Sequence, residues 1–431
     1  MKSALLGKIR DRSVIVGVIG LGYVGLPLIT GFGKNKVRTV GYDIDRSKIK
    51  SLEKCKSYVI DIKDEELKSI KKYFTPTNDP KLLNKADALI VCVPTPLRKT
   101  KDPDISFIMS ALEIILNLDY RGKLIILEST TYPGTTEEIM QTALEKEGKY
   151  KAGRDFFLAF SPERVDPGNK NFNIENTPKV VGGVTPSCLS AAKGLYEITV
   201  QKVFPVSSTR VAESVKLLEN VFRSVNIGLV NELAQLCNRM KIDIWEVIAA
   251  ASTKPYGFMP FYPGPGLGGH CIPLDPFYLS WKAKAYDFNT RFIELAGEIN
   301  GSMPYFVSGL AQDILNKYKK SVNGANILIL GVAYKKNIGD TRESPAIDVI
   351  KILNAQKGKM CYHDPFVPEI DIGGKKYKSS VLDKKTLSKI DIAIIVTDHE
   401  KVDYRKVIAL GIPVLDTRNV IKKKFRNVYT F

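Results

Sequence analysis

The chain is poor in residues that bind structural metals. It has three histidines and six cysteines among 431 residues, and no two cysteines form a C-x-x-C pair. Structural zinc sites take their ligands from cysteine and histidine at short, recurring spacings. We therefore expect no structural metal site.

Long apolar runs are also absent. No window approaches about eighteen uncharged apolar residues, the length that a membrane-spanning helix requires. The opening letters MKSALL contain no apolar segment long enough for a signal peptide. We expect a cytoplasmic protein with reduced thiols and no membrane partner. With 44% hydrophobic residues the chain can bury more than one core, so we expect two or three domains.

A basic tail is missing as well, although the formal charge is +18. The 64 lysines and arginines are dispersed among 46 acidic residues. Polyanion binding instead predicts a basic stripe with interleaved aromatic residues. We therefore expect no nucleic-acid partner, and the excess charge favours solubility and the attraction of small phosphorylated ligands.

The strongest pattern that is present lies near the N-terminus. A β-branched apolar run at 13–19 leads into the letters G-L-G-Y-V-G at 20–25. The first glycine permits a tight turn, the second lets the backbone approach a pyrophosphate, and the third lets helix and strand pack. The helix N-terminus supplies amide donors to the anion. The residues expected to hold a dinucleotide here are Gly20, Gly22, Tyr23, Val24 and Gly25.

An acid follows the next apolar run. Residues 37–42 end in Asp43, eighteen positions beyond Gly25. A carboxylate at this point accepts both ribose hydroxyls and repels a 2′-phosphate, which favours NAD over NADP as cofactor. Arg46 and Lys48 follow closely and weaken this preference, and Lys48 is a further candidate cofactor contact.

Apolar strands and amphipathic helices then alternate. The expected strands are 88–93, 123–127, 156–160, 179–182 and 202–205, and the expected helices are 106–116 and 135–145. This alternation predicts an α/β fold with a parallel, doubly wound sheet that binds ligands at the carboxyl ends of its strands. Candidate site residues follow three of these strands, namely Pro94, Thr95, Glu128, Ser129, Thr130, Ser161, Glu163 and Arg164.

One long helix comes next. Apolar residues recur every three or four positions from 211 to 236 without a proline, and 207–209 offers candidate N-caps. Some thirty helical residues span about 45 Å and can join two domains or form a dimer core. Lys216 and Asn220 lie on one face, which Arg223 extends. This polar face is either part of a reactive site or simply solvated.

A second sheet is predicted near the C-terminus, with strands at 326–331, 359–362, 391–396 and 413–415. A polar loop at 333–345 contains Lys335 and Arg342 and runs into a helix that Pro345 can start. It is either an anion site or a solvated loop. We expect two Rossmann-like, doubly wound parallel-sheet domains joined by a helical middle, with boundaries at 1–205, 206–305 and 306–431.

A single thiol stands in an unusual loop. The letters YPGPGLGGHCIPLDPFYL at 262–279 set Cys271 behind several glycines and four residues before Asp275. Glycines let the main chain approach a ligand closely, so Cys271 is a candidate nucleophile with Asp275 as a nearby proton acceptor. A buried thiol after a turn is the alternative.

Six motifs in one order resemble the UDP-glucose/GDP-mannose dehydrogenase family over nearly the whole chain. They are GLGYVGLP, ESTTYPGTT, SPERV, KLLEN, GPGLGGHCIPLDP and KKNIGDTRESP. The stretch from Thr253 to Cys271 is most similar to the UDP-N-acetylglucosamine 6-dehydrogenase branch.

The resemblance implies a four-electron oxidation. Members convert the carbon-six alcohol of a nucleotide sugar to a carboxylate, using two NAD without releasing the aldehyde. A cysteine thiolate holds the aldehyde as a thiohemiacetal, and a second hydride transfer leaves a thioester that water hydrolyses. The implied partners are a UDP-sugar and a second copy of the chain, which pairs through the long helix.

The same resemblance assigns roles to single residues. Cys271 matches the nucleophile, Asp275 a proton-handling partner with a bound water, and Lys216 with Asn220 the group that stabilises oxyanion character. Glu163 matches a carboxylate that orients or activates the hydrolytic water, and Thr130 lies near that water and the nicotinamide. The implied cofactor contacts also include Pro94, Thr95, Thr130 and Arg342. The implied substrate contacts are Glu163, Arg164, Lys216, Asn220, Tyr262, Gly266, Gly268, His270, Tyr334, Lys335 and Arg418.

Some features depart from the UDP-glucose members. Arg164-Val-Asp166-Pro-Gly follows Glu163 where they carry Phe-Leu and a second acid, and Leu274 stands where animal enzymes often carry lysine. His270 either touches the ligand or packs as a neutral imidazole. A noncatalytic nucleotide-sugar sensor and a hydroxyacid dehydrogenase of the 6-phosphogluconate type are the alternative functions. The sugar stays open among UDP-N-acetylglucosamine, its galacto and manno epimers, and UDP-glucose.

Overall fold

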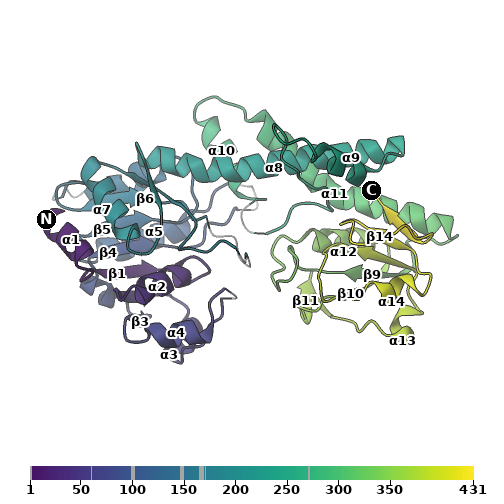
Figure 1. Cartoon of the computed structure of the whole chain (residues 1–431), viewed down its shortest axis with the longest axis horizontal. Helices are drawn as coiled ribbons and strands as arrows, with labels where there is room; N and C mark the ends of the chain where they lie inside the picture. The colour runs from purple at the N-terminus through teal and green to yellow at the C-terminus, as the bar shows by residue number, and fades with distance from the viewer. Residues whose placement is uncertain are drawn as a thin grey trace. The chain divides into compact units, whose positions relative to one another are not determined.

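The computed structural model describes residues 2–59, 61–98, 102–145, 150–164, 169, 171–269 and 272–431. The chain divides into two compact units. Unit 1 comprises Met1–Glu219 and Phe277–Asp287, and unit 2 comprises Asn220–Pro276 and Phe288–Phe431. The division passes through the long helix α8 (Thr209–Met240), which Figure 1 labels.

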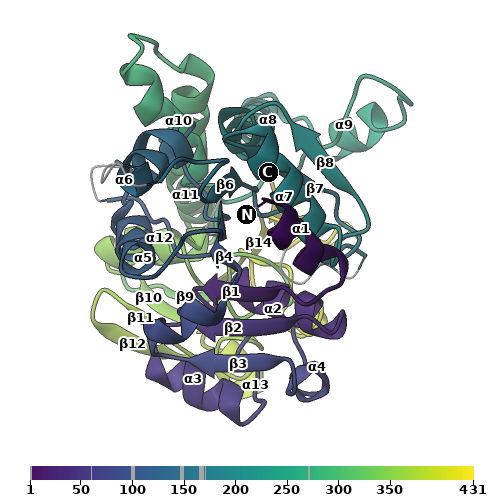
Figure 2. The same ribbon diagram turned by 90° about the vertical axis from the view of Figure 1, so that its left-hand side faces the viewer.

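Unit 1 is built on an eight-stranded sheet in the order β3-β2-β1-β4-β5-β6-β7-β8. Its strands are β1 (Ile15–Ile19), β2 (Arg38–Tyr42), β3 (Phe74–Thr77), β4 (Ala88–Val91), β5 (Leu124–Leu127), β6 (Phe157–Phe160), β7 (Lys179–Gly183) and β8 (Val203–Val206). Figure 2 shows β1, β2 and β3 side by side at one edge. The central strands are almost wholly apolar and buried, as parallel strands covered on both faces should be.

The predicted parallel sheet is confirmed, with one strand pair as an exception. All neighbouring strands of unit 1 are parallel except β6 and β7, which pair antiparallel with Phe160 opposite Gly182. A parallel return requires a crossover connection, usually a helix. The described part of 161–178 contains no helix, so the chain re-enters the sheet in the opposite direction.

Most helices of unit 1 connect its strands. They are α2 (Gly25–Lys34), α3 (Arg46–Glu53), α4 (Asp64–Ile70), the 3₁₀ helix η1 (Pro80–Lys85), α5 (Ser106–Leu116), α6 (Thr142–Glu145) and α7 (Pro186–Tyr196). Helix α1 (Lys2–Arg10) precedes β1, and α10 (Asp275–Lys284) belongs to unit 1 from Phe277 onward. The expected helix at 135–145 forms as a π-helical segment, η2 (Thr135–Gln141), followed by α6. There Glu213 of α8 accepts hydrogen bonds from the amides of Gly134 and Thr136, which ties the start of η2 to α8.

Unit 2 holds a smaller, wholly parallel sheet in the order β10-β9-β13-β14-β15, beside the hairpin β11–β12. Its strands are β9 (Asn326–Leu330), β10 (Lys359–His363), β11 (Glu369–Ile372), β12 (Lys375–Lys378), β13 (Ile392–Ile395), β14 (Val414–Asp416) and β15 (Val428–Thr430). Its helices are α9 (Ile244–Ala251), α11 (Arg291–Lys317), α12 (Pro345–Ala355), α13 (Lys384–Leu387) and α14 (Arg405–Ile408). The predicted start of a helix at Pro345 is confirmed. The second Rossmann-like sheet is thus present, with β11, β12 and β15 as strands that the sequence analysis did not find.

The long helix is confirmed from Thr209 to Met240. Ser208 lies just before it, and its hydroxyl accepts a hydrogen bond from the Val211 amide. Among the helices that the structure describes, none has a long enough uncharged apolar stretch to cross a bilayer.

Candidate active site

The three glycines after β1 have three different surroundings. Gly20 has a φ of +95°, and a Cβ there would lie 2.5 Å from the Cys92 carbonyl oxygen. A Cβ on Gly25 would lie 1.9 Å from the Gly20 carbonyl oxygen, so this glycine lets α2 pack against the turn. A Cβ on Gly22 would meet nothing within 4 Å. The turn therefore leaves open backbone only at the position where a pyrophosphate must approach, which fits a dinucleotide.

Asp43 is fixed beside this turn. One oxygen, Oδ2, accepts hydrogen bonds from the Leu21 amide at 2.9 Å and from Lys48 Nζ at 3.0 Å. The other, Oδ1, accepts from the Asp45 amide at 2.9 Å. Asp43 is buried, whereas Lys48 keeps a third of its side chain exposed. Lys48 thus contacts the acid itself, and Oδ1 retains capacity for another donor such as a ribose hydroxyl.

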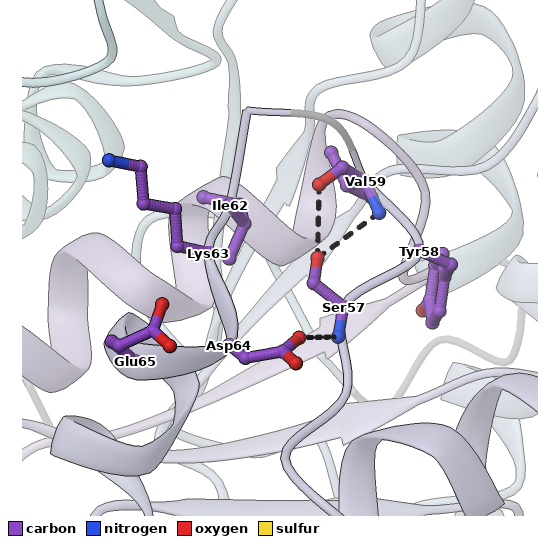
Figure 3. A pocket seen from close by; sticks show the side chains of 7 residues that line it. All are labelled: Ser57, Tyr58, Val59, Ile62, Lys63, Asp64 and Glu65. Atoms are coloured by element: carbon purple, nitrogen blue, oxygen red, sulfur yellow. Dashed lines mark hydrogen bonds between the residues drawn. The ribbon is translucent and has the colours of Figure 1, made fainter.

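A separate surface pocket of about 450 Å³ is lined by the loop that follows α3 and by the start of α4 (Figure 3). Its polar groups largely bond to one another, since Ser57 donates its amide to Asp64 and exchanges hydrogen bonds with Val59. Its link to the turn is Tyr58, whose hydroxyl donates to the Leu21 carbonyl at 2.7 Å. None of the predicted site residues lines this pocket.

The ends of neighbouring strands bring further candidates to one edge of unit 1. After β4, Pro94 is exposed and Thr95 is buried, with the Thr95 carbonyl accepting a hydrogen bond from Tyr278 of α10 at 2.9 Å. After β5, Thr130 is partly exposed, and Ser129 donates its hydroxyl to the Val93 carbonyl at 2.7 Å. Since β1, β4, β5 and β6 are adjacent and parallel, the segments after them share the edge at which the glycine turn lies.

Glu163 follows β6 and meets the long helix. Lys216 of α8 donates from Nζ to the Glu163 backbone carbonyl at 2.7 Å, and both residues are buried. The Glu163 carboxylate accepts from the Arg164 amide at 2.7 Å. Arg164 in turn forms a 2.7 Å ion pair with Glu219 and donates to the Pro178 carbonyl. Unit 1 therefore holds an ammonium group in place through a main-chain oxygen, and the ammonium keeps further donors.

Asn220 lies one helical turn after Lys216 and belongs to unit 2. Its side-chain amide donates to Asp275 Oδ2, and the two residues are 2% and 3% exposed. The interpretation of Lys216 and Asn220 as a solvated face is therefore wrong, although Arg223 of the same stripe is exposed. An amide bound to a carboxylate fixes the orientation of both groups.

The glycine loop of unit 2 packs tightly against residues distant in sequence. A Cβ on Gly264 would lie 2.5 Å from the Arg418 guanidinium, and a Cβ on Gly268 would lie 2.7 Å from the Tyr334 side chain. Gly266 lies against Pro345, and the Gly269 amide donates to the Arg342 carbonyl at 3.1 Å. The loop thus gathers Tyr334 and Arg418 around closely packed backbone.

Two buried asparagines anchor this loop and were not predicted. Asn231 of α8 accepts from the Gly264 amide at 2.9 Å and donates to Asn300 of α11 at 2.8 Å. Asn300 then donates to the Ser224 carbonyl. Buried amides inside apolar helix faces were the available signal, because such groups need partners.

Other predicted contacts of unit 2 lie near the surface. Tyr262 is exposed and stacks on Trp245, with ring centroids 6.2 Å apart. Lys335 is partly exposed, and Arg342 pairs with Asp340 through contacts of 2.6 to 3.1 Å. His270 and Cys271 lie outside the described residues.

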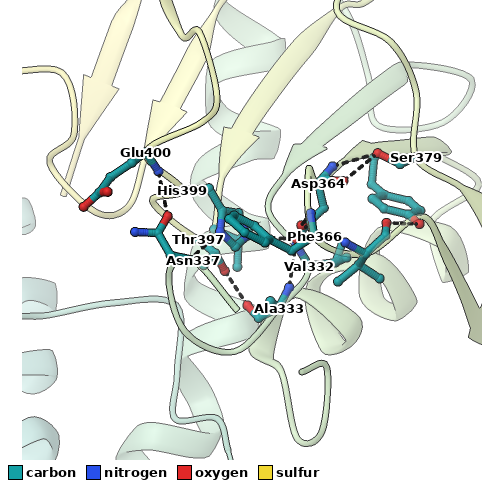
Figure 4. Close-up of polar contacts among 12 residues, drawn as sticks. Val332, Ala333, Asn337, Asp364, Phe366, Ser379, Thr397, His399 and Glu400 are labelled. Atoms are coloured by element: carbon teal, nitrogen blue, oxygen red, sulfur yellow. Dashed lines mark hydrogen bonds and ion pairs between the residues drawn. The ribbon is translucent and has the colours of Figure 1, made fainter. Parts of the chain in front are cut away.

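A histidine–aspartate pair supports the loop after β9 (Figure 4). Asp364 Oδ2 accepts from the amides of Val332 and Ala333 and from His399 Nε2 at 2.9 Å. The opposite ring nitrogen of His399 accepts from the Asn337 amide at 2.9 Å. This fixes the neutral tautomer of a fully buried histidine. The pair holds both ends of the segment that carries Tyr334 and Lys335.

Three family models match the chain in order. They describe the NAD-binding, central and UDP-binding domains of the UDP-glucose/GDP-mannose dehydrogenase family, at residues 14–200, 210–302 and 328–423. The three matches together span most of the chain.

Individual proteins are similar over comparable lengths. UDP-N-acetyl-D-glucosamine 6-dehydrogenase of Pseudomonas aeruginosa is 38% identical over 84% of this chain and 85% of its own. NDP-N-acetyl-D-galactosaminuronic acid dehydrogenase of Ralstonia solanacearum is 31% identical over 95% and 96%. The structure of UDP-D-ManNAc dehydrogenase from Pyrococcus horikoshii superposes with a TM-score of 0.88 at 34% identity, covering 96% and 98%. The chain therefore belongs to the UDP-glucose/GDP-mannose dehydrogenase family and is an NAD-dependent oxidoreductase.

Proposed function

We propose that the protein oxidises the carbon-six alcohol of a UDP-N-acetylhexosamine to the carboxylate, with two NAD per sugar. The observation that carries this proposal is the buried Lys216, whose ammonium is held by the Glu163 carbonyl at 2.7 Å. A fixed cation with spare donors suits a reaction in which an oxygen becomes negatively charged. The sensor alternative has no support among the related proteins, which are dehydrogenases by name.

The site residues would have separate roles in the two oxidations. The glycine turn and Asp43 would hold NAD, which would supply the hydride acceptor for carbon six. Lys216 and Asn220 stabilise the oxyanion that forms there, and Asp275, oriented by Asn220, handles the accompanying proton. The Cys271 thiolate adds to the aldehyde that the first oxidation produces, so the half-oxidised sugar stays attached to sulfur through the second oxidation, which gives the thioester.

Hydrolysis completes the reaction. Water adds to the thioester carbon, the carbon–sulfur bond breaks, and its electron pair leaves on the Cys271 sulfur. We assign the uptake of the water proton to the Glu163 carboxylate, with Thr130 beside the water. Glu163 is buried and its Oε1 is held by the Arg164 amide, which supports a fixed orientation.

The binding domains follow from the same assignment. We infer an NAD-binding domain at 1–205, a central helical domain at 206–305 and a UDP-sugar-binding domain at 306–431. Gly266, Gly268, His270, Tyr262, Tyr334, Lys335 and Arg418 would contact the UDP-sugar. Arg342 would have to exchange its pairing with Asp340 to reach the cofactor.

The substrate that we favour is UDP-N-acetylglucosamine. By their names, the relatives given above act on different sugars. The gluco enzyme is 38% identical to this chain, the galacto enzyme 31% and the manno enzyme 34%. These identities are so similar that they favour one epimer over another only weakly. Incubating the purified protein with NAD and each of UDP-N-acetylglucosamine, its two epimers and UDP-glucose tests the assignment. We expect the highest kcat/KM with UDP-N-acetylglucosamine, and a higher value with another sugar would replace it.

We also infer a homodimer through α8. The described part of this helix exposes a row of large apolar side chains, which are Val211, Leu218, Phe222, Leu229, Leu233, Leu236 and Met240. Exposed apolar surface of this kind is typical of a self-association face. Sedimentation of the protein and of a Leu218→Asp/Leu236→Asp variant tests it, because only a dimer through this face would dissociate.

A further inference from the structure

Unit 1 contains a cluster of ionisable side chains, buried below the carboxyl ends of its strands, that the mechanism above does not use. Its members are Glu128 after β5, Lys179 at the start of β7, Tyr196 at the end of α7 and the carboxylate of Glu163. Their exposed fractions are 1%, 4%, 0% and 7% respectively. Charged groups are almost never so deeply buried without a reason, and one of these four is the proposed base.

The contacts within the cluster are specific. The two oxygens of Glu128 accept separate hydrogen bonds, Oε1 from Lys179 Nζ and Oε2 from the Tyr196 hydroxyl. Lys179 Nζ also lies 3.6 Å from Glu163 Oε2, so one ammonium serves two carboxyl groups. Glu163 is thereby held from the side opposite to Arg164, whose amide binds Oε1.

One of the two carboxyl groups of the cluster must be protonated. Two carboxylates beside one ammonium would leave a net negative charge in a buried site, which is unfavourable. Burial, assisted by Glu163, raises the pKa of Glu128 to about 8, although Lys179 opposes the shift. Burial would lower the pKa of Lys179, but Glu128 and Glu163 outweigh it and the pKa is raised. At neutral pH the proton therefore resides on Glu128 and Lys179 is charged.

The other groups that face Glu128 are neutral. Burial raises the pKa of the Tyr196 hydroxyl and of the Cys92 thiol, which follows β4, well above their usual ranges. Ser161, after β6, is fully buried and donates to the Val180 carbonyl at 2.8 Å. Apart from the Glu163 carboxylate and the Lys179 ammonium, these described groups around Glu128 are therefore neutral.

We propose that Glu128 and Lys179 are positioning residues for Glu163 in thioester hydrolysis. Lys179 holds the Glu163 carboxylate in the orientation that receives the water proton, and the protonated Glu128 lets that carboxylate remain charged in a buried site. The water oxygen bonds to the acyl carbon, its proton moves to Glu163, and the carbon–sulfur electrons leave on Cys271. Glu128 keeps its own proton throughout. This inference rests on the proposed role of Glu163.

The arrangement predicts that hydrolysis, and not hydride transfer, depends on Glu128. Ionisation of Glu128 adds a negative charge that competes with Glu163 for Lys179. The rate of hydrolysis should therefore fall above about pH 8. A glutamine at 128 cannot ionise and retains both the size and a donor, so it should keep the neutral-pH rate and lose this alkaline decline.

Single-turnover kinetics on the full-length protein test the proposal. NADH formation reports the two oxidations, and intact-protein mass spectrometry reports the sugar adduct on Cys271. We compare Glu128→Gln, Glu128→Ala, Lys179→Met and the control Glu213→Gln, which changes another buried carboxyl bound to Gly134 and Thr136. Wild-type enzyme that yields no uronate with any of the four UDP-sugars would refute the proposed function itself.

If the wild type does yield uronate, the variants decide the role of the cluster. We expect Glu128→Ala and Lys179→Met to keep a burst of two NADH, to accumulate the adduct, and to hydrolyse it at least about tenfold more slowly. Glu128→Gln should stay near the wild-type rate at pH 7 without the decline near pH 8, and Glu213→Gln should keep that decline. Equal slowing of the burst and of hydrolysis, or an unchanged pH profile in Glu128→Gln, would overturn the proposal.

Discussion

Asp43 in unit 1 and Asp364 in unit 2 occupy the same place in two similar sheets. Each follows the strand that pairs with the first strand of its sheet, β2 with β1 and β10 with β9. Each accepts an amide from the turn after that first strand, Leu21 at 2.9 Å and Val332 at 2.8 Å. Both turns begin with a glycine of positive φ, Gly20 at +95° and Gly331 at +83°.

The two acids differ in what else they bind. Asp43 Oδ1 accepts one hydrogen bond among the described residues. Asp364 accepts from the amides of Val332, Ala333, Phe366 and Val367 and from His399. Burial would raise the pKa of Asp364, but His399 and these amides hold it below its usual range. Its acceptor capacity is used by the protein, so a ribose hydroxyl has no place there.

The turns differ at their third residue in the same sense. Gly22 leaves open space where a Cβ would stand, whereas the corresponding Ala333 is fully buried. The same topology therefore leaves open backbone and a spare acceptor oxygen beside the acid of unit 1, and closes both beside the acid of unit 2. The two units share this fold and differ in the donors that surround Asp43 and Asp364 and in the methyl group of Ala333, so these local groups set the binding capacity of each turn.

The largest expected effect comes from breaking the scaffold acid. In Asp364→Asn, an amide group must face backbone N–H donors and His399 loses its charged partner. We expect the free energy of unfolding to fall by about 3 kcal/mol, because a buried charged acceptor is lost. Urea denaturation measures this, with the exposed Asp371→Asn as the matched control. A loss below about 1 kcal/mol would mean that the pair does not hold unit 2.

A single substitution can make the turn at Gly22 resemble the turn at Ala333. Gly22→Ala adds the methyl group that Ala333 carries, where no neighbour lies within 4 Å. The protein should stay folded, and NAD should bind about 100-fold more weakly, roughly 2.7 kcal/mol. Isothermal titration measures the affinity, and Gly7→Ala, which also adds a methyl group in open space, is the control. Unchanged NAD affinity would place the pyrophosphate elsewhere.

A smaller effect is expected for the cofactor acid. Asp43→Ala removes the ribose acceptor and should weaken NAD about tenfold, with little change for NADP. Lys48→Ala leaves the acid and removes its cation, so it should sharpen the preference for NAD over NADP. Titrations with both cofactors check this, and an equal loss of both in Asp43→Ala would reject the ribose contact.

The pH dependence of stability should have opposite signs for two buried acids. Asp364 has a lowered folded pKa, so its contribution is present above the unfolded pKa and is lost as pH falls through the folded value. Glu128 has a raised folded pKa of about 8, so its contribution is present below the unfolded pKa and is lost as pH rises toward 8. Urea denaturation from pH 3 to about 9 measures the free energy of unfolding of each variant. Asp364→Asn should lose the decline of this free energy at acid pH, and Glu128→Gln should lose its decline toward pH 8. Equal slopes in wild type and variants would contradict these pKa directions.

Local patterns explain how much the sequence could predict. The turn from Gly20 to Gly25, Asp43 and the 32-residue helix α8 were predictable, because short-range glycine spacing and a helical period specify them. The positions of Thr130 and Glu163 after strands were predictable because those strands are apolar runs.

The remainder depends on pairings between distant residues. The antiparallel entry of β7, the contact of His399 with Asp364 and the link of Lys179 to Glu128 join positions 22, 35 and 51 apart. No local period encodes such contacts. Their signals were polar residues at or beyond the ends of apolar strands, which have meaning only once the sheet order is known.

The most direct test of the account is the amount of NADH formed per UDP-sugar consumed. Trapping of the half-oxidised sugar on sulfur predicts two NADH and one uronic acid per sugar, with no free aldehyde. Cys271→Ser should lower turnover by orders of magnitude and leave NAD affinity nearly unchanged. One NADH per sugar, or near-normal uronate from Cys271→Ser, would contradict covalent catalysis in this protein.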